Sequence, residues 1–298
     1  MRLIDGRAIA AAITAEVTAA VAELTAAGTT PTLAVVVPTD DEATAWYVRS
    51  IERAAAKVGI TCRVDTLDHP DGDAITNHLD TLSADPGVHG IICQTPLPAG
   101  VSLDAVGAHI DPAKDIDGAN PESLGRLAAG LPTYPPATAA AVLEILRRER
   151  IPLVGARAVV VGRSTVVGKP VALLLLAEHA TVTVCHSRTI DLPAVCAEGD
   201  VLVAAVGRTH LIGAAHMKPG AVVIDVGTNP TPDGGLAGDV DPDGADRAAA
   251  LTPVPGGVGP VTTMLLMRHA AQAAAKRSFS PVKAPVLTTV SSWMTTRE

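Results

Sequence analysis

The stretch from Gly162 to Gly168 combines residue types that suit the binding of a phosphate group. It follows a β-forming run at 156–161 and precedes an apolar helical pattern. Glycine lets the backbone approach a phosphate, and the helix N-terminus offers free N–H groups and a positive dipole end. Ser164 replaces the middle glycine of G-x-G-x-x-G and Gly168 comes one residue late, so an ordinary tight turn remains an alternative.

The end of the next predicted strand indicates which dinucleotide would bind. Sheets that bind NAD usually place Asp or Glu there to hold the ribose 2′-hydroxyl. Here the strand 180–184 runs into Cys-His-Ser-Arg at 185–188, with no carboxylate. Ser187 can donate a hydrogen bond, and Arg163 and Arg188 carry positive charge, which suits a 2′-phosphate. These residues favour NADP over NAD, although a solvated surface charge is the alternative reading of Arg188.

Two later predicted strands also end in glycine-containing turns, at 204–208 and 225–229. The carboxyl ends of parallel strands form the ligand crevice of open α/β sheets, although purely structural turns have a similar composition. The residues that we expect at the dinucleotide are Gly162, Arg163, Ser164, Val167, Gly168, His186, Ser187, Arg188, Ala205, Val206, Gly207, Asp225, Gly227 and Thr228.

Four other stretches are unusual enough to suggest a second ligand site. They are Tyr-Val-Arg-Ser-Ile at 47–51, Gln-Thr-Pro-Leu-Pro at 94–98, Lys-Asp-Ile-Asp-Gly at 114–118, and Thr-Pro-Val-Pro-Gly-Gly-Val-Gly-Pro at 252–260. Three Gly and three Pro within the nine residues of the last stretch predict a fixed, ligand-shaped backbone.

The elements that must position these residues alternate between strands and helices. Helices are predicted at 8–27, 42–58, 74–83, 138–150, 169–176 and 262–275, and strands at 33–37, 61–64, 88–93, 156–161, 180–184, 201–206 and 221–225. Gly and Pro break the segment 121–136, where we expect no regular structure, and the tail 278–298 should be largely irregular. The alternation predicts parallel sheets covered by helices, in two α/β units with a cleft between them.

Composition narrows the class of protein. The 298 residues suffice for two domains of ordinary size, and 48% apolar with 18% charged residues is globular. A net charge of −8 argues against a binder of nucleic acid or membrane surfaces. The four cysteines form no C-x-x-C pair, so we expect no metal site. Scattered thiols, short apolar runs and the lack of a signal peptide predict a cytoplasmic protein.

The motifs Q-x-P-L-P, K-D-x-D-G and P-V-P-G-G-V-G-P, together with 162–170, occur in the order found in one enzyme family. The chain resembles the methylenetetrahydrofolate dehydrogenase/methenyltetrahydrofolate cyclohydrolase family up to about residue 275. The resemblance implies a folate-binding catalytic domain at 1–138 plus 264–298, a Rossmann-type NADP domain at 139–263, and a homodimer. It also implies a tetrahydrofolate one-carbon substrate and the oxidation of 5,10-methylenetetrahydrofolate with NADP.

The resemblance also assigns roles to individual residues. Asp117 matches the acidic residue that holds the pterin ring, and a carboxylate can accept two parallel N–H bonds from its amino-pyrimidine edge. Tyr47 matches a tyrosine that stacks on the folate, and Gln94 matches a glutamine that orients a catalytic lysine. A capping or turn Asp and a core Tyr are the structural alternatives. The substrate contacts implied are Tyr47, Gln94, Pro96, Leu97, Asp117, Pro255, Gly256 and Gly257.

One position departs from the family pattern Y-V-x-x-K, because Ile51 stands where the lysine is expected. On a helix, residues four apart share a face, so Tyr47 and Ile51 should face the same site. By resemblance, the lysine transfers protons in the cyclohydrolase step, which isoleucine cannot do. Hydride transfer depends mainly on proximity and orientation. We therefore expect dehydrogenase activity to persist and hydrolysis of the methenyl product to be weak or lost.

Two other readings of the sequence remain open. One is a folate- or nucleotide-binding protein that has lost its chemistry together with the lysine. The intact stretch 162–168 argues against it, because such a protein has no need of a cofactor pocket. The other is a dehydrogenase of a different small substrate in the same frame, against which Asp117 and Gln94 argue because they suit a pterin edge.

Overall fold

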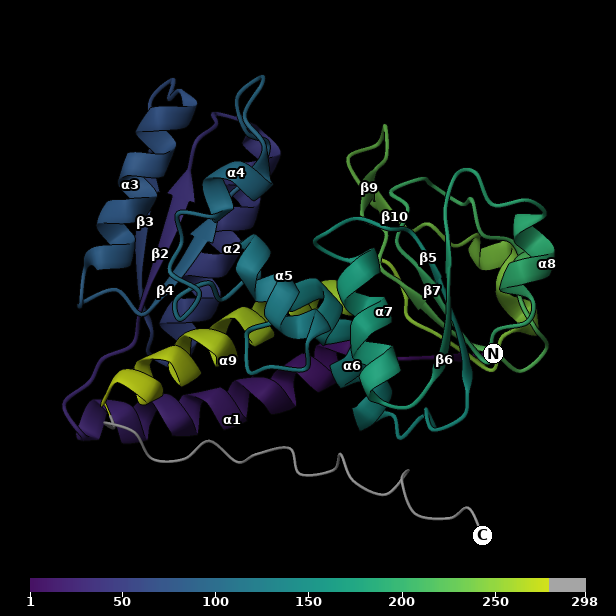
Figure 1. Cartoon of the computed structure of the whole chain (residues 1–298). Helices are drawn as coiled ribbons and strands as arrows, with labels where there is room; N and C mark the ends of the chain where they lie inside the picture. Colours follow the sequence, from purple (N-terminus) through teal and green to yellow (C-terminus); the bar gives the residue numbers. More distant parts are fainter. Residues whose placement is uncertain (279–298) are drawn as a thin grey trace, which may run out of the picture.

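In the computed structural model, which describes residues 1–278, two α/β units stand on a pair of long helices (Figure 1). The first unit has a parallel three-stranded sheet in the order β3-β2-β4. Its elements are β2 (Thr32–Val37), β3 (Thr61–Thr66), β4 (Gly90–Cys93), α2 (Glu42–Val58), α3 (Gly72–Ala84) and α4 (Leu103–Gly107). Strand β2 is apolar on both faces because helices cover both sides: α2 packs on one face, and α3 and α4 pack on the other.

The second unit has a parallel six-stranded sheet in the order β1-β11-β8-β7-β5-β6. The strands are β1 (Arg2–Leu3), β5 (Arg157–Val161), β6 (Thr181–Cys185), β7 (Val201–Ala204), β8 (Val222–Asp225) and β11 (Ala250–Leu251). Helices α6 (Ala137–Arg148) and α7 (Gly168–Ala177) cover one face. The other face carries α8 (Leu192–Cys196), η1 (Ala214–His216) and η2 (Pro242–Arg247), and β9 (Asn229–Pro230) and β10 (Leu236–Ala237) form a short hairpin.

Two long helices, α1 (Gly6–Ala26) and α9 (Val258–Ser278), lie side by side beneath the first unit and reach the second (Figure 1). The carboxylate of Asp5 begins α1 by accepting hydrogen bonds from two backbone N–H groups. Among the described residues α1 is the helix long and apolar enough to cross a membrane. Its stripe of Ile9, Ile13, Val17, Val21 and Leu24 is buried in the same core as α9, as in the core helix of a globular protein.

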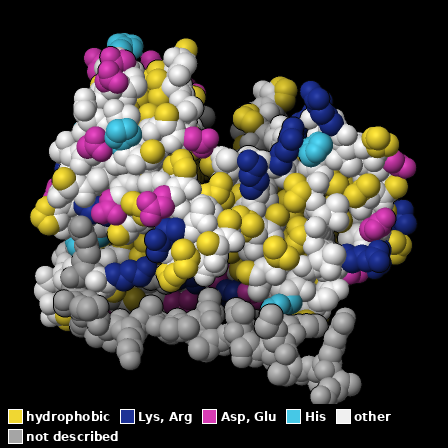
Figure 2. Space-filling model, in the orientation of Figure 1, with side chains coloured by type: hydrophobic (Ala, Val, Ile, Leu, Met, Phe, Trp, Pro, Cys, Tyr) yellow, Lys and Arg dark blue, Asp and Glu magenta, His cyan; other side chains and the backbone are white. Residues whose placement is uncertain are grey.

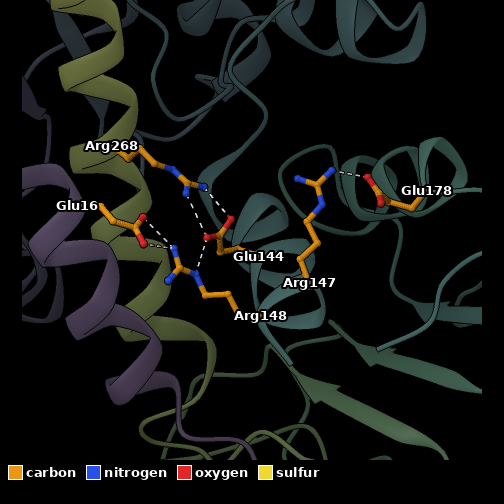
Figure 3. Close-up of polar contacts among 6 residues, drawn as sticks. All are labelled: Glu16, Glu144, Arg147, Arg148, Glu178 and Arg268. Atoms are coloured by element: carbon orange, nitrogen blue, oxygen red, sulfur yellow. Dashed lines mark hydrogen bonds and ion pairs between the residues drawn. The ribbon is translucent and has the colours of Figure 1, made fainter. Parts of the chain in front are cut away.

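A network of ion pairs joins α1, α6 and α9 (Figure 3). Glu144 of α6 accepts a hydrogen bond from Arg148 at 2.7 Å and from Arg268 of α9 at 3.0 Å, and Arg148 also contacts Glu16 of α1 at 2.8 Å. Burial opposes ionisation of Glu144, but the hydrogen bonds from the two arginines hold its pKa below the ordinary value. The network therefore fixes α6, the first helix of the second unit, against both long helices.

Most predicted elements are confirmed, and the errors have local causes. Residues 121–136 do contain a helix, α5 (Pro121–Ala128), because Asn120 caps it and proline is tolerated in the first turn. Helix α9 begins at Val258, so the last three residues of the loop predicted at 252–260 are helical. The two-residue strands β1 and β11 are too short to show periodicity. The predicted tail lies outside the described residues beyond Ser278.

We predict that Glu144→Gln lowers the free energy of unfolding by about 1–3 kcal/mol at pH 7, because both arginines lose a buried charged acceptor. The folded pKa of Glu144 is depressed, so its contribution is present above the unfolded pKa of about 4.3 and is lost as the pH falls through the folded value. Urea unfolding at several pH values measures this. Glu198→Gln, in the exposed pair with Arg157, is the control and should change stability by less than about 0.5 kcal/mol. Equal effects of the two substitutions would contradict the prediction.

Candidate active site

The segment 114–118 is held against the edge of β4 by its own backbone and by the side chain of Lys114. Ile91 forms a bridge with Asp115, and its N–H donates to the carbonyl of Lys114 at 2.8 Å. The ammonium group of Lys114 is fully buried and donates to the carbonyls of Leu82 at 2.9 Å and Asp85 at 2.6 Å. Lys114 therefore secures the segment to the end of α3.

The first aspartate of the K-D-x-D-G motif is also structural. Its carboxylate accepts hydrogen bonds from the N–H of Ala119 at 2.8 Å, the N–H of Asn120 at 2.9 Å and the hydroxyl of Ser123 at 2.6 Å. These bonds shape the turn that leads into α5. Two of the three charged residues of the motif thus build the segment, and Asp117 is the one left for a ligand.

Asp117 is packed closely between this turn and the start of α6. Gly118 has a φ of +67°, and a Cβ there would lie 2.6 Å from the ring of Pro136. The N–H of Ala137, the first residue of α6, donates to the Asp117 carboxylate at 3.3 Å. Burial raises the pKa of Asp117 to about 7 in spite of that bond. A carboxyl group with so little compensation is typical of a binding or catalytic site.

Tyr47 on α2 lies near Asp117. Burial raises the pKa of its hydroxyl, and the charge of Asp117 raises it further. The start of α2 is fixed by Thr44, whose N–H donates to the carboxylate of Asp41 at 2.7 Å and whose hydroxyl lies within hydrogen-bond distance of the carbonyl of Thr95 at 3.1 Å. The latter bond joins α2 to the stretch 94–98, which carries the buried Gln94, the half-buried Leu97 and the exposed Pro96.

Ile51 follows Tyr47 by one helical turn and is fully buried. It belongs to the core cluster that also contains Val48 of α2 and Ile116, the residue before Asp117. Arg49 and Lys57, two basic residues of this helix, are exposed on other faces of it. Position 51, where the resemblance implies a lysine, is thus an apolar packing position in this chain.

The loop 252–257 borders the long helices at the junction of the two units. A Cβ on Gly6, the first residue of α1, would lie 1.8 Å from the carbonyl oxygen of Gly257, so the loop presses directly on that helix. Gly256 has a φ of +109°, and a Cβ on Gly257 would lie 2.6 Å from the Pro253 carbonyl. The predicted fixed backbone is therefore observed, with Pro255 exposed at its tip.

The turn 162–168 links β5 to α7 and needs both of its glycines. Gly162 has a φ of +130°, and a Cβ there would lie 2.1 Å from the carbonyl oxygen of Ala205. A Cβ on Gly168 would lie 2.2 Å from the carbonyl oxygen of Gly162. The hydroxyl of Ser164 accepts from the N–H of Val167 at 3.1 Å and more weakly from Gly168 at 3.4 Å. Ser164 thus stabilises the turn by accepting hydrogen bonds from the turn's own backbone.

Two buried aspartates shape the neighbouring loops. Asp239 accepts hydrogen bonds from the backbone of Val206 at 2.6 Å and Gly207 at 3.0 Å after β7, and Asp225 accepts from Gly227 at 2.9 Å after β8. Asp225 also accepts from the N–H of Asp239 at 3.0 Å. The carboxylate of Asp225, a residue predicted at the dinucleotide, therefore accepts backbone N–H bonds and shapes the loop after β8. Thr228 is exposed. Asp239 was missed because nothing in its local sequence distinguishes it.

The register of β5 and β6 brings together the residues predicted for a 2′-phosphate. Val161, the last residue of β5, pairs with Cys185, the last residue of β6. Arg163 and Ser187 each follow two residues later. Arg163, Ser187 and Arg188 are exposed at this edge. His186 is half-buried and shapes the turn, because its Nδ1 accepts from the N–H of Arg188 at 3.1 Å. Figure 2 shows basic side chains on the flank of the second unit, beside a hollow between the units.

Parts of the segment 114–118 and of the turn 162–168 line one cavity at the seam between the units. A cavity of about 220 Å³ is lined by Gly118, Ala119 and Asn120 on one side and by Thr165 and Val166 of the turn 162–168 on the other. The segment that carries Asp117 therefore faces the dinucleotide turn. Within residues 1–278 no cluster of His, Cys, Asp or Glu suits a metal ion.

Comparison with known proteins agrees with this geometry. Residues 4–117 match the family profile of the tetrahydrofolate dehydrogenase/cyclohydrolase catalytic domain, and residues 136–278 match that of its NAD(P)-binding domain. The bifunctional protein FolD of Parafrankia sp. (strain EAN1pec) is 64% identical over 275 residues, which cover 92% of this chain and 99% of that protein.

Solved structures show the same architecture. The bifunctional enzyme FolD, a methylenetetrahydrofolate dehydrogenase/cyclohydrolase from Campylobacter jejuni, superposes with a TM-score of 0.90 at 36% identity, covering 93% of this chain and 99% of that one. The Trypanosoma brucei enzyme, crystallised with NADP cofactor and an inhibitor, gives a TM-score of 0.87 at 38% identity, covering 92% and 97%. The chain therefore belongs to the tetrahydrofolate dehydrogenase/cyclohydrolase family.

Proposed function

We propose that this protein oxidises 5,10-methylenetetrahydrofolate to 5,10-methenyltetrahydrofolate with NADP, and hydrolyses the methenyl product poorly or not at all. The observation that carries the proposal is the position of Asp117, a half-buried carboxyl group with a raised pKa. It precedes Gly118, which lines the cavity between the units opposite Thr165 and Val166 of the turn 162–168. Ile51 is fully buried one helical turn after Tyr47. Family membership supplies the reaction class, and the residues of this chain decide between its two steps.

The pterin ring would be held by its amino-pyrimidine edge. The Asp117 carboxylate can accept two parallel N–H bonds from that edge, and Tyr47 offers a ring on which the folate can stack. Gln94 and Leu97, with the backbone of 255–257, would form the remaining walls. These contacts with the pterin ring would orient the methylene carbon of the folate toward the second unit.

NADP, when bound, supplies the acceptor for the hydride. One C–H bond of the methylene group breaks, its electron pair leaves with the hydrogen, and the folate becomes a cation. No proton moves in this step, so the protein contributes mainly proximity and orientation. An apolar Ile51 in place of a lysine also removes a positive charge from beside the developing cation.

Hydrolysis makes different demands, because water must add to the methenyl carbon while protons move between oxygen and nitrogen. Ile51 has no ionisable proton and is fully buried. Loss of one general acid–base group typically slows a reaction by about 10²- to 10⁴-fold. We therefore assign the dehydrogenase step to this chain and expect little cyclohydrolase activity.

The 2′-phosphate of NADP would lie beyond the paired ends of β5 and β6. Arg163 and Ser187 flank that edge, since they follow the paired residues Val161 and Cys185 by two positions each. Arginine offers a full charge and several donors to a phosphate. From family resemblance we also propose a homodimer in the cytoplasm.

Substitution of Asp117 tests the pterin grip. We predict that Asp117→Asn lowers kcat/KM for the folate by at least about 100-fold, because an amide N–H then faces the N–H groups of the ring. In the unaltered protein kcat/KM should fall as the pH drops below about 7, since the ionised carboxylate binds and its pKa is raised to about 7. Steady-state kinetics between pH 5 and 8 measure both effects. The exposed Asp73→Asn is the control, and a flat profile over this range would contradict the assignment.

A spectroscopic assay separates the two activities. We predict that methenyl product and NADPH accumulate in equal amounts, and that the methenyl signal decays no faster than in buffer. Ile51→Lys should accelerate the decay by about 10²- to 10⁴-fold, whereas Ile51→Met, which lacks a transferable proton, should not. Rapid enzymatic decay in the unaltered protein would refute the loss of hydrolysis. Absence of NADPH formation would instead favour a non-catalytic binding protein.

Substitution of Arg163 tests the preference for NADP over NAD. We predict that Arg163→Ala raises KM for NADP by about tenfold or more and leaves KM for NAD within about twofold, because it removes a charged donor to the 2′-phosphate. Arg157→Ala, at the opposite end of the same strand, is the matched control. An equal rise for both cofactors would show that Arg163 does not read the 2′-phosphate.

A further inference from the structure

His269 of α9 is buried beside the segment that carries Asp117. Only 5% of the residue is exposed, and its Nδ1 lies 2.8 Å from the carbonyl oxygen of Ile116. Because a carbonyl oxygen can only accept, Nδ1 must carry the proton. Burial lowers the pKa of His269 to about 4, so the imidazole is neutral at pH 7 and protonated on Nδ1 alone.

This hydrogen bond acts on the peptide that joins Ile116 to Asp117. The peptide unit is planar, so holding its carbonyl oxygen also holds the amide group from which Asp117 projects. The carboxylate is separately held by the N–H of Ala137 at 3.3 Å. Asp117 is thus secured on its main chain by α9 and on its side chain by α6.

The two helices that hold Asp117 are themselves joined. Arg268, the neighbour of His269, binds Glu144 of α6 with two hydrogen bonds at 3.0 and 3.2 Å (Figure 3). The connections from α9 to Ile116, from Asp117 to α6, and from α6 back to α9 form a closed loop. A shift of either helix would therefore move the carboxylate.

The imidazole ring is held in turn by Tyr134, whose ring centroid lies 5.3 Å away at a tilt of 42°. The ammonium group of Lys276 lies over the Tyr134 ring, 4.3 Å from its centre. The Tyr134 hydroxyl is buried and has no hydrogen-bond partner among the described residues. Its ring, rather than its hydroxyl, therefore supports His269.

We propose that His269 is a positioning residue for folate recognition: by donating from Nδ1 to the Ile116 carbonyl, it orients Asp117 toward the pterin edge. The proposal rests on the proposed function and adds a residue of α9 to the folate site. Since α9 also begins directly after the loop 252–257, one helix would align two walls of that site.

The test compares a donor-free variant with a donor-conserving one. His269→Leu should raise KM for methylenetetrahydrofolate by about tenfold and leave KM for NADP within about twofold. His269→Asn should restore the folate KM to within about threefold, because its Nδ2 can donate from nearly the same place as Nδ1. If the leucine variant fails to fold, His269→Met supplies the donor-free state with a more adaptable side chain.

The control is His89→Leu, which removes another buried histidine. His89 accepts from the N–H of Thr32 at 3.1 Å, at the start of β2. It should lower the melting temperature without changing the folate KM. A proportional rise of both KM values in His269→Leu, or failure of the asparagine to rescue, would overturn the positioning role.

A direct binding measurement keeps this test separate from the proposed function. Calorimetric titration of tetrahydrofolate needs no turnover, so it reports on His269 even if the protein forms no NADPH. About tenfold weaker binding to the donor-free variant, with NADP binding unchanged, supports the proposal. Equal tetrahydrofolate affinity in the leucine, asparagine and unaltered proteins overturns it.

Discussion

The site depends on keeping one half-buried carboxyl group, Asp117, poorly compensated by hydrogen bonds and available to a ligand. An isolated carboxylate in an apolar setting is costly unless hydrogen bonds compensate it, and the group responds by a raised pKa. Asp115 is saturated by three donors, whereas Asp117 receives a long bond from Ala137. In the proposed function, a pterin edge would supply the missing donors to Asp117.

The rest of the fold holds that group in place. Lys114 and Asp115 build the segment from within, and Gly118 allows the turn to pass against Pro136. Helices α6 and α9 approach from the other side and are joined through Glu144 and Arg268 (Figure 3). The same long helices contact the first unit and helix α6 of the second, so the two candidate sites share one framework.

Much of this arrangement could be predicted from the sequence, because its signals are local. Alternating strands and helices predict the two parallel sheets, and the glycines at 162 and 168 predict a tight turn with close backbone contact. The structure confirms both. Helix α2 occupies the predicted range 42–58, since an Asp cap and a glycine stop mark its ends.

The parts that were missed depend on contacts between distant residues. Ile116 stands in the K-D-x-D-G motif, but its partner His269 lies 153 positions away and outside any recognisable motif. Asp239 reaches the loop after β7 across 33 positions, and β1 joins the second sheet by pairing with β11. That pairing also shows that residues 2–3 belong to the second sheet, which a boundary drawn from motifs alone could not reveal.

The central claim is that Asp117 presents the folate to the cofactor within one cleft. A crystal structure of the ternary complex with NADP and a stable folate analogue tests it most directly. We expect the amino-pyrimidine edge on the Asp117 carboxylate, with the one-carbon position about 3–3.5 Å from the nicotinamide carbon that accepts hydride. A pterin bound away from Asp117, or two ligands that exclude each other, would contradict it.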